Sequence, residues 1–131
     1  MKDRAKEGSI AADCSCRTGL NELANRVQDT VRNQPLGPYP RRAYVIELEV
    51  PRHESSCGCV YVGESYLPAE VRLEQHRDGV HSSADVRRFG VMTRPDLYEM
   101  LPPVPPRFAR PLESALGRVL RECGFCVHGA H

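Results

Sequence analysis

The chain has 131 residues, of which 40% are hydrophobic and 27% are charged. This length fits one compact domain with a short additional segment, and the composition is that of a globular protein. It excludes collagen-like chains and chains too polar to form a core. No apolar stretch is long enough to cross a membrane, and the polar start lacks the apolar part of a signal peptide, so we expect a cytoplasmic protein with no membrane partner.

The basic and acidic side chains almost balance, with 18 lysines and arginines against 17 aspartates and glutamates. Bulk charge therefore does not indicate a nucleic-acid partner, and any basic surface must be local. Between Arg72 and Arg94 the chain has five arginines and three acids, an excess of two. Within this stretch Arg77, Arg87 and Arg88 are expected to contact phosphate groups of a substrate, and a solvated helix surface is the competing interpretation.

Residues 1–40 are expected to form an N-terminal appendage. Polar and small residues dominate it, and a proline-rich linker, Pro35–Pro40, closes it. Apolar residues recur at helical spacing from Leu20 to Val31, which predicts one amphipathic helix after Thr18. We expect this helix to dock either on the following domain or on a partner.

Residues 41–131 are expected to form one small α/β domain that begins with a hairpin. From Ala43 to Val50 the chain has a period of two, with Tyr44, Ile46, Leu48 and Val50 on one face and Glu47 and Glu49 on the other, which predicts a strand. The β-branched and aromatic stretch Cys59–Gly63 predicts a second strand. The polar connection between them indicates an antiparallel pair with a long loop.

Two short helices are predicted after the hairpin. The first spans Ala69–His76, because Pro68 suits a helix start and Gly79 suits the end. The second begins at a capping box on Ser82 and ends at Gly90.

A short strand, a proline-rich loop and a long helix complete the prediction. Residues 94–100 are expected to be extended, and the prolines that follow exclude a helix until Pro111, which suits the first turn of the longest helix. An apolar stripe predicts that this helix ends before Gly124, and residues 125–128 predict a final strand. The fold class is therefore α/β in the order β-β-α-α-β-α(-β), with a central three-stranded, mostly antiparallel sheet flanked by helices.

Several residues occur in the order and spacing of a known family. The tripeptide Arg42-Ala43-Tyr44 lies in the first strand, and Tyr61-Val62-Gly63 ends the second. Arg72 and His76 follow four positions apart, on one face of the next helix. Glu113 lies near the start of the longest helix. This order resembles the GIY-YIG nuclease family over roughly residues 42–128.

The resemblance implies a metal-dependent endonuclease that hydrolyses DNA phosphodiester bonds. It implies that Tyr44 and Tyr61 position or deprotonate the attacking water, and that Glu113 binds one Mg²⁺ or Mn²⁺ ion. The first tripeptide lacks the Gly and Ile of the family pattern. The two tyrosines are 17 positions apart, a longer separation than the family usually shows, so the loop between them is an insertion. Such a small domain has little surface for reading a long sequence, so its specificity would depend on residues 1–40, on a partner, or on a substrate shape such as a flap or branch.

The residue types suit this chemistry on their own. Cleavage of a phosphodiester requires a nucleophilic water, stabilisation of charge on the phosphate, and help for the leaving oxygen. Arg72 stays protonated and can bind two phosphate oxygens, while the carboxylate of Glu113, with waters and phosphate oxygens, can hold one Mg²⁺. His76 is an alternative base or a hydrogen-bond partner, and Gly63 leaves room for a close approach by backbone or substrate.

Two other functions are compatible with the sequence. One is a catalytically inactive GIY-YIG-like domain that binds nucleic acid or another partner. The other is a zinc-binding protein, because the six cysteines form three close pairs. Without an export signal, thiols or a metal site are expected rather than disulfides. The candidate zinc ligands are Cys123, Cys126, His128 and His131, and Cys57 and Cys59 could complete the coordination from across the sheet.

Overall fold

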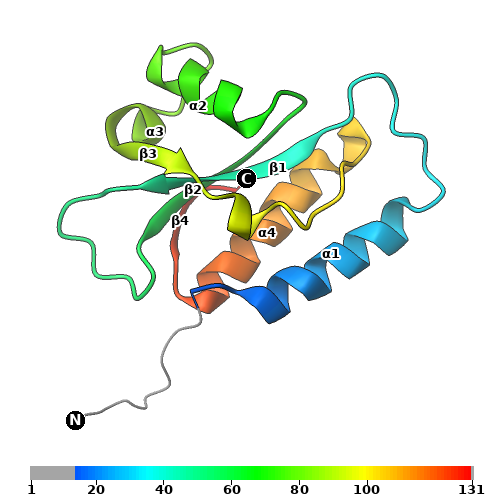
Figure 1. Cartoon of the computed structure of the whole chain (residues 1–131), viewed down its shortest axis with the longest axis horizontal. Coiled ribbons are helices and arrows are strands. Elements are labelled where there is room, and N and C mark those ends of the chain that lie inside the picture. Colours follow the sequence, from blue (N-terminus) through cyan, green and yellow to red (C-terminus); the bar gives the residue numbers. More distant parts are fainter. Residues whose placement is uncertain (1–13, 131) are drawn as a thin grey trace, which may run out of the picture.

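The computed structural model describes residues 14–130, and its centre is a four-stranded sheet in the order β3-β1-β2-β4 (Figure 1). Strands β1 (Arg42–Leu48) and β2 (Cys59–Ser65) form the expected antiparallel pair. Strand β3 (Gly90–Thr93) pairs antiparallel with β1, and β4 (Cys126–Gly129) pairs parallel with β2. The α/β class is confirmed, but the expectation of three strands is wrong, because β4 adds a fourth and makes the sheet mixed.

Strand β1 is buried on both faces. Ala43 and Val45 point into one hydrophobic cluster, while Tyr44 and Ile46 point into another on the opposite side. A strand covered by helices on both faces loses the simple alternation of apolar and polar residues. The acidic side chain of Glu47, near the end of the strand, is half-buried.

Helices α1 (Arg17–Val31) and α4 (Ala109–Cys123) pack against each other over one face of the sheet (Figure 1). Leu20 and Leu23 of α1 are buried in the same cluster as Leu116 of α4. Of the two docking positions expected for the first helix, the structure shows the one on the domain. Among residues 14–130, no helix combines the length and the apolar character needed to cross a bilayer.

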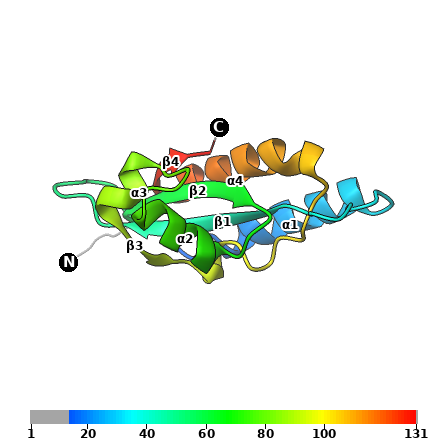
Figure 2. The ribbon, with the colours of Figure 1, turned by 90° about the horizontal axis from the view of Figure 1, so that it is seen from above.

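Helices α2 (Ala69–Arg77) and α3 (Ala84–Phe89) cover the other face (Figure 2). The predicted cap of α3 is wrong by one residue, because Ser83 and not Ser82 precedes the helix. The Ser83 hydroxyl accepts a hydrogen bond from the Val86 N–H at 3.5 Å. Ser83 has the extended backbone that an N-cap residue needs.

The third strand lies earlier than the sequence predicts. Strand β3 follows α3 directly, because Gly90 ends the helix in an extended conformation, and the expected strand at residues 94–100 is absent. In its place Pro95–Leu97 forms a 3₁₀ helix, in which Leu97 is fully buried. A second 3₁₀ helix, Pro106–Phe108, leads into α4.

Two disulfides join the start of α1 to the rest of the chain. Cys14 is bonded to Cys57, and Cys16 to Cys123, over 43 and 107 positions. The expectation of reduced thiols is therefore wrong for these four cysteines. Spacing could not reveal the pairing, because each bond joins cysteines from different close pairs, and connectivity depends on the folded chain.

Candidate active site

Three elements bring the predicted aromatic residues together on the α2 side of the hairpin. The ring centres of Tyr44 and Tyr61 are 6.2 Å apart, and that of His76 lies 5.3 Å from Tyr61. The Tyr44 hydroxyl oxygen lies 3.0 Å from His76 Nε2. Tyr61 pairs with Ile46, two positions from Tyr44, so the two tyrosines are diagonal neighbours on one face of the sheet.

Glu113 of α4 acts on the same group through its charge. Its side chain is buried, with an exposed fraction of 8%. Its negative charge is one of the causes that raise the pKa of both Tyr44 and Tyr61. We use the name tyrosine site for the five side chains that the structure brings into mutual contact or electrostatic reach: Tyr44, Tyr61, Arg72, His76 and Glu113.

Gly63 provides the space for the Tyr44 ring. It lies opposite Tyr44 in the β1–β2 register, and a Cβ atom at this position would lie 2.6 Å from the Tyr44 hydroxyl oxygen. The group that approaches Gly63 closely is thus the Tyr44 side chain, whereas the sequence led us to expect backbone or substrate. Because the Tyr44 side chain is buried and hydrogen-bonded to His76, moving its ring away from position 63 would cost stability.

We expect Gly63→Ala to lower the free energy of unfolding by about 1–3 kcal/mol, because the new methyl group overpacks the site. Urea unfolding measures this loss. In a chain that also carries Tyr44→Ala, the same substitution should cost much less, because the ring it would strike is gone. Equal losses in both backgrounds would contradict this explanation of the glycine.

Arg72 lies at the rim of the tyrosine site, where its guanidinium is held by α2 and the turn after it. It donates to the His81 carbonyl at 3.0 Å and to the side-chain oxygen of Gln75. One of its terminal nitrogens is 3.4 Å from His76 Nε2. The positive charge is therefore fixed beside the imidazole and the phenols.

Both tyrosines are protonated at neutral pH. Burial raises the pKa of Tyr44, and Arg72 partly offsets this by hydrogen bonding and by its charge. Burial, followed by the effects of Tyr44 and Glu113, raises the pKa of Tyr61 to about 12. Neither phenol can serve as a base near pH 7 unless further positive charge enters the site.

His76 is neutral and carries its proton on Nε2. Burial, followed by the charge of Arg72, lowers the pKa of His76 to about 4. The Ser83 backbone N–H donates to Nδ1 at 2.8 Å, which leaves Nε2 as the protonated nitrogen of a neutral ring. Nε2–H therefore donates to the Tyr44 oxygen. Of the two roles expected for His76, this arrangement favours the hydrogen-bond partner.

The lowered pKa of His76 makes the fold sensitive to acid. The unfolded chain binds a proton at the ordinary pKa of 6.5 and the folded chain only near 4, so stability should fall as pH decreases through this window. We expect a loss of up to about 3 kcal/mol from this residue. Urea unfolding at pH 7 and pH 4 should show a smaller loss in His76→Gln than in the natural chain. Identical losses would contradict the assignment.

A polar hollow of about 380 Å³ opens beside Arg72. Arg41 and Glu64 also line it and form an ion pair at 2.7 Å. The Arg41 guanidinium lies 5.7 Å from the centre of the Tyr66 ring. Sequence reasoning missed Arg41, although the adjacent basic residues Arg41 and Arg42, directly before a predicted strand, were a visible signal.

The three other arginines expected to contact phosphate do not line this hollow. Arg77 donates to the Val91 carbonyl of β3 at 2.7 Å. Arg88 lies over the ring of Phe89, 5.1 Å from its centre, and Arg87 is exposed on α3. The structure therefore does not bring these three arginines into the hollow beside Arg72.

The expected zinc ligands are brought together only in part. Cys126 Sγ and His128 Nε2 are 3.5 Å apart. Cys123 instead forms the disulfide with Cys16, and His131 lies outside the described residues.

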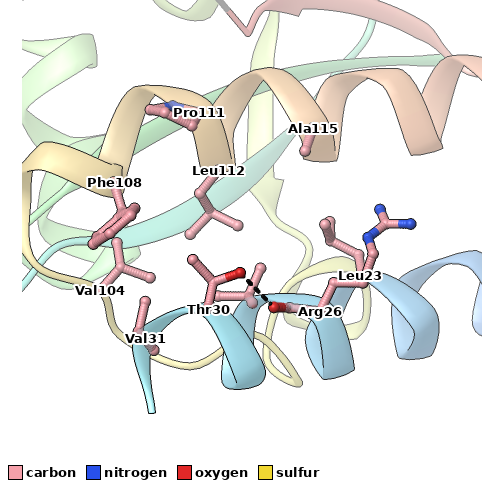
Figure 3. A pocket seen from close by; sticks show the side chains of 10 residues that line it. Leu23, Arg26, Thr30, Val31, Val104, Phe108, Pro111, Leu112 and Ala115 are labelled. Carbon is pink, nitrogen blue, oxygen red and sulfur yellow. Dashed lines mark hydrogen bonds between the residues drawn. The ribbon is translucent and has the colours of Figure 1, made fainter. Parts of the chain in front are cut away.

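Another pocket, of about 180 Å³, lies between α1 and α4 (Figure 3). Its lining is largely apolar and includes Leu23 and Phe108. The Thr30 hydroxyl donates to the Arg26 carbonyl at 2.8 Å within it. None of the side chains of the tyrosine site lines this pocket.

No protein-family model, curated protein or solved structure matches this chain. The chemistry of the tyrosine site is therefore inferred from its own geometry and charges.

Proposed function

We propose that this protein is a GIY-YIG-type endonuclease that hydrolyses DNA phosphodiester bonds with one Mg²⁺ or Mn²⁺ ion. The main support is that two phenols, a neutral imidazole and a guanidinium come together from β1, β2 and α2, and that the charge of the buried Glu113 of α4 acts on both phenols. Hydrolysis of a phosphodiester uses groups that orient the attacking water, bind the phosphate and hold a divalent cation, and this combination of side chains offers all three.

Arg72 binds the phosphate that is attacked. Its charge is permanent, and it lines a polar hollow together with Arg41. As the attacking oxygen adds to phosphorus, negative charge grows on the phosphate oxygens, so a fixed guanidinium stabilises the transition state more than the ground state. The contacts with Gln75 and His81 hold the guanidinium in place before the substrate arrives.

Glu113 is the carboxylate suited to hold the ion. It is buried and lies within electrostatic reach of both phenols. One carboxylate, completed by waters and phosphate oxygens, suits a single Mg²⁺. The bound ion would supply positive charge that favours deprotonation nearby and stabilises the leaving 3′ oxygen.

Tyr44 and Tyr61 orient the attacking water, and His76 positions Tyr44. Nε2–H of His76 occupies one lone pair of the Tyr44 oxygen and fixes the direction of the hydroxyl. The charge of Glu113 contributes to the raised pKa of both phenols, so a cation held by Glu113 would offset that contribution and lower these pKa values. Tyr44 and Tyr61 would then be better able to accept a proton from the water.

Metal-dependent cleavage tests the proposal. The purified full chain is incubated with supercoiled plasmid and with branched DNA, in Mg²⁺, in Mn²⁺ and in excess chelator. We expect nicking or cutting that requires the ion, with branched DNA as the better substrate. DNA binding by a folded chain without cleavage of either substrate would overturn the enzyme proposal and establish a binding domain instead.

A further inference from the structure

Two free thiols lie opposite each other at one end of the sheet. Cys59 begins β2 and Cys126 begins β4, and the parallel register pairs them directly. Cys59 is buried and Cys126 is half-buried. The other four cysteines form the two disulfides, so this pair alone offers thiol sulfurs.

His128 lies beside this thiol pair. It follows Cys126 by two positions and so lies on the same face of β4. Its Nε2 is 3.5 Å from Cys126 Sγ, and its Nδ1 is 2.8 Å from a carboxylate oxygen of Asp85 in α3. The Asp85 carboxylate accepts a hydrogen bond from Nδ1–H of His128, and Nε2 is the ring nitrogen that faces the sulfur.

His53 reaches the same place from the loop between β1 and β2. A ring nitrogen of His53 and the sulfurs of Cys59 and Cys126 all lie within 4.8 Å of one another. Its Nδ1 accepts a hydrogen bond from the Ser55 N–H at 2.9 Å, and a neutral ring must give up this bond when its lone pair binds a cation. The exposed His53 is therefore the most easily exchanged member of the group.

We propose that His53, Cys59 and Cys126, whose ligand atoms lie within 4.8 Å of one another, form a zinc site, that His128, beside Cys126, completes it as the fourth ligand, and that Asp85 orients His128. Two thiolates with two imidazoles are a recurrent donor set for structural zinc. With Zn–S of about 2.3 Å and Zn–N of about 2.0 Å, a tetrahedral site separates sulfur from nitrogen by about 3.5 Å. The Cys126–His128 pair has this separation. A carboxylate on the second ring nitrogen is a common outer contact of zinc-bound histidine.

The ion would link β4 and the β1–β2 loop to strand β2, because its ligands come from all three segments. Strand β4 has four residues and pairs with β2 at an edge of the sheet (Figure 1). In the same register Tyr61 lies directly opposite His128, one of the proposed ligands. The zinc site thus supports the strand that carries one phenol of the tyrosine site.

Metal content and cobalt spectroscopy test the site under non-reducing, oxygen-free conditions, which preserve the disulfides. We expect one zinc per natural chain and loss of zinc in the Cys59→Ser/Cys126→Ser chain. Co²⁺ in place of zinc should give the strong visible bands of tetrahedral coordination and a thiolate-to-cobalt charge-transfer band.

Asp85→Asn keeps all four ligands and should weaken zinc binding roughly 10- to 100-fold, with circular dichroism unchanged. Asp78→Asn, at an exposed residue at the end of α2, is the matched control and should bind zinc as the natural chain does. The proposal is overturned if the folded natural chain binds no zinc, if the double cysteine variant retains it, or if the cobalt spectrum lacks the charge-transfer band.

Discussion

Replacement of Arg72 by alanine should slow DNA cleavage roughly 100- to 1,000-fold, the cost of removing one fixed group that stabilises developing negative charge. The guanidinium lines the polar hollow and is already held by Gln75 and His81, so little reorganisation is needed when a phosphate binds. Single-turnover cleavage of a branched DNA in Mg²⁺ measures the loss. A lysine at position 72 should restore only part of the rate, because it keeps the charge but lacks the planar pair of donors.

Arg118→Ala is the matched control for Arg72→Ala. Arg118 is an exposed arginine on α4 and does not line the hollow beside Arg72. Its removal should leave the rate of the chemical step close to that of the natural chain. Equal losses in the two variants would show that Arg72 contributes only general positive charge.

Glu113→Gln should reduce cleavage at least roughly 100-fold and raise the Mg²⁺ concentration needed for half-maximal rate. The substitution keeps the size of the side chain but removes the charge proposed to hold the ion. Glu122→Gln on the same helix is the matched control, because Glu122 is exposed and distant in sequence from the buried carboxylate. Measuring the rate against Mg²⁺ concentration separates weaker ion binding from slower chemistry.

A second readout of Glu113→Gln does not depend on activity. Because the Glu113 carboxylate raises the pKa of Tyr61, its removal should lower that pKa from about 12. Ultraviolet titration of phenolate formation, compared between the natural chain and Tyr61→Phe, isolates the signal of Tyr61. An unchanged titration in Glu113→Gln would contradict the placement of the carboxylate near the phenols.

Local signals predicted the elements that carry most of the tyrosine site. The alternation in β1, the breaker Gly79 after α2 and the left-handed Gly124 after α4 all depend on neighbouring residues. Strand β3 was displaced in the prediction because the extended conformation of Gly90 joins it directly to α3. The parallel pairing of β4 and the two disulfides depend on contacts between distant segments, which no local pattern records.

The order of residues in the sequence predicted which side chains belong to the tyrosine site. It did not predict which nitrogen of His76 carries the proton or where the Arg72 guanidinium lies. The proton on His76 Nε2 depends on the Ser83 N–H, and the position of Arg72 depends on the His81 carbonyl. These are backbone groups, and the sequence pattern assigns them no role. Of the proposed zinc ligands, the sequence offered Cys59 only as a donor from across the sheet and did not indicate His53. Strand register and a loop conformation bring these two residues to Cys126.

Cleavage of one branched DNA in Mg²⁺ by four proteins tests most directly whether the tyrosine site is a single catalytic unit. The proteins are the natural chain, Arg72→Ala, Glu113→Gln and the chain with both substitutions. We expect the natural chain to cut and the double variant to lose little more than the worse single variant, because losses within one catalytic unit are not additive. Cleavage by the double variant at the natural rate would contradict the assignment of these residues to catalysis.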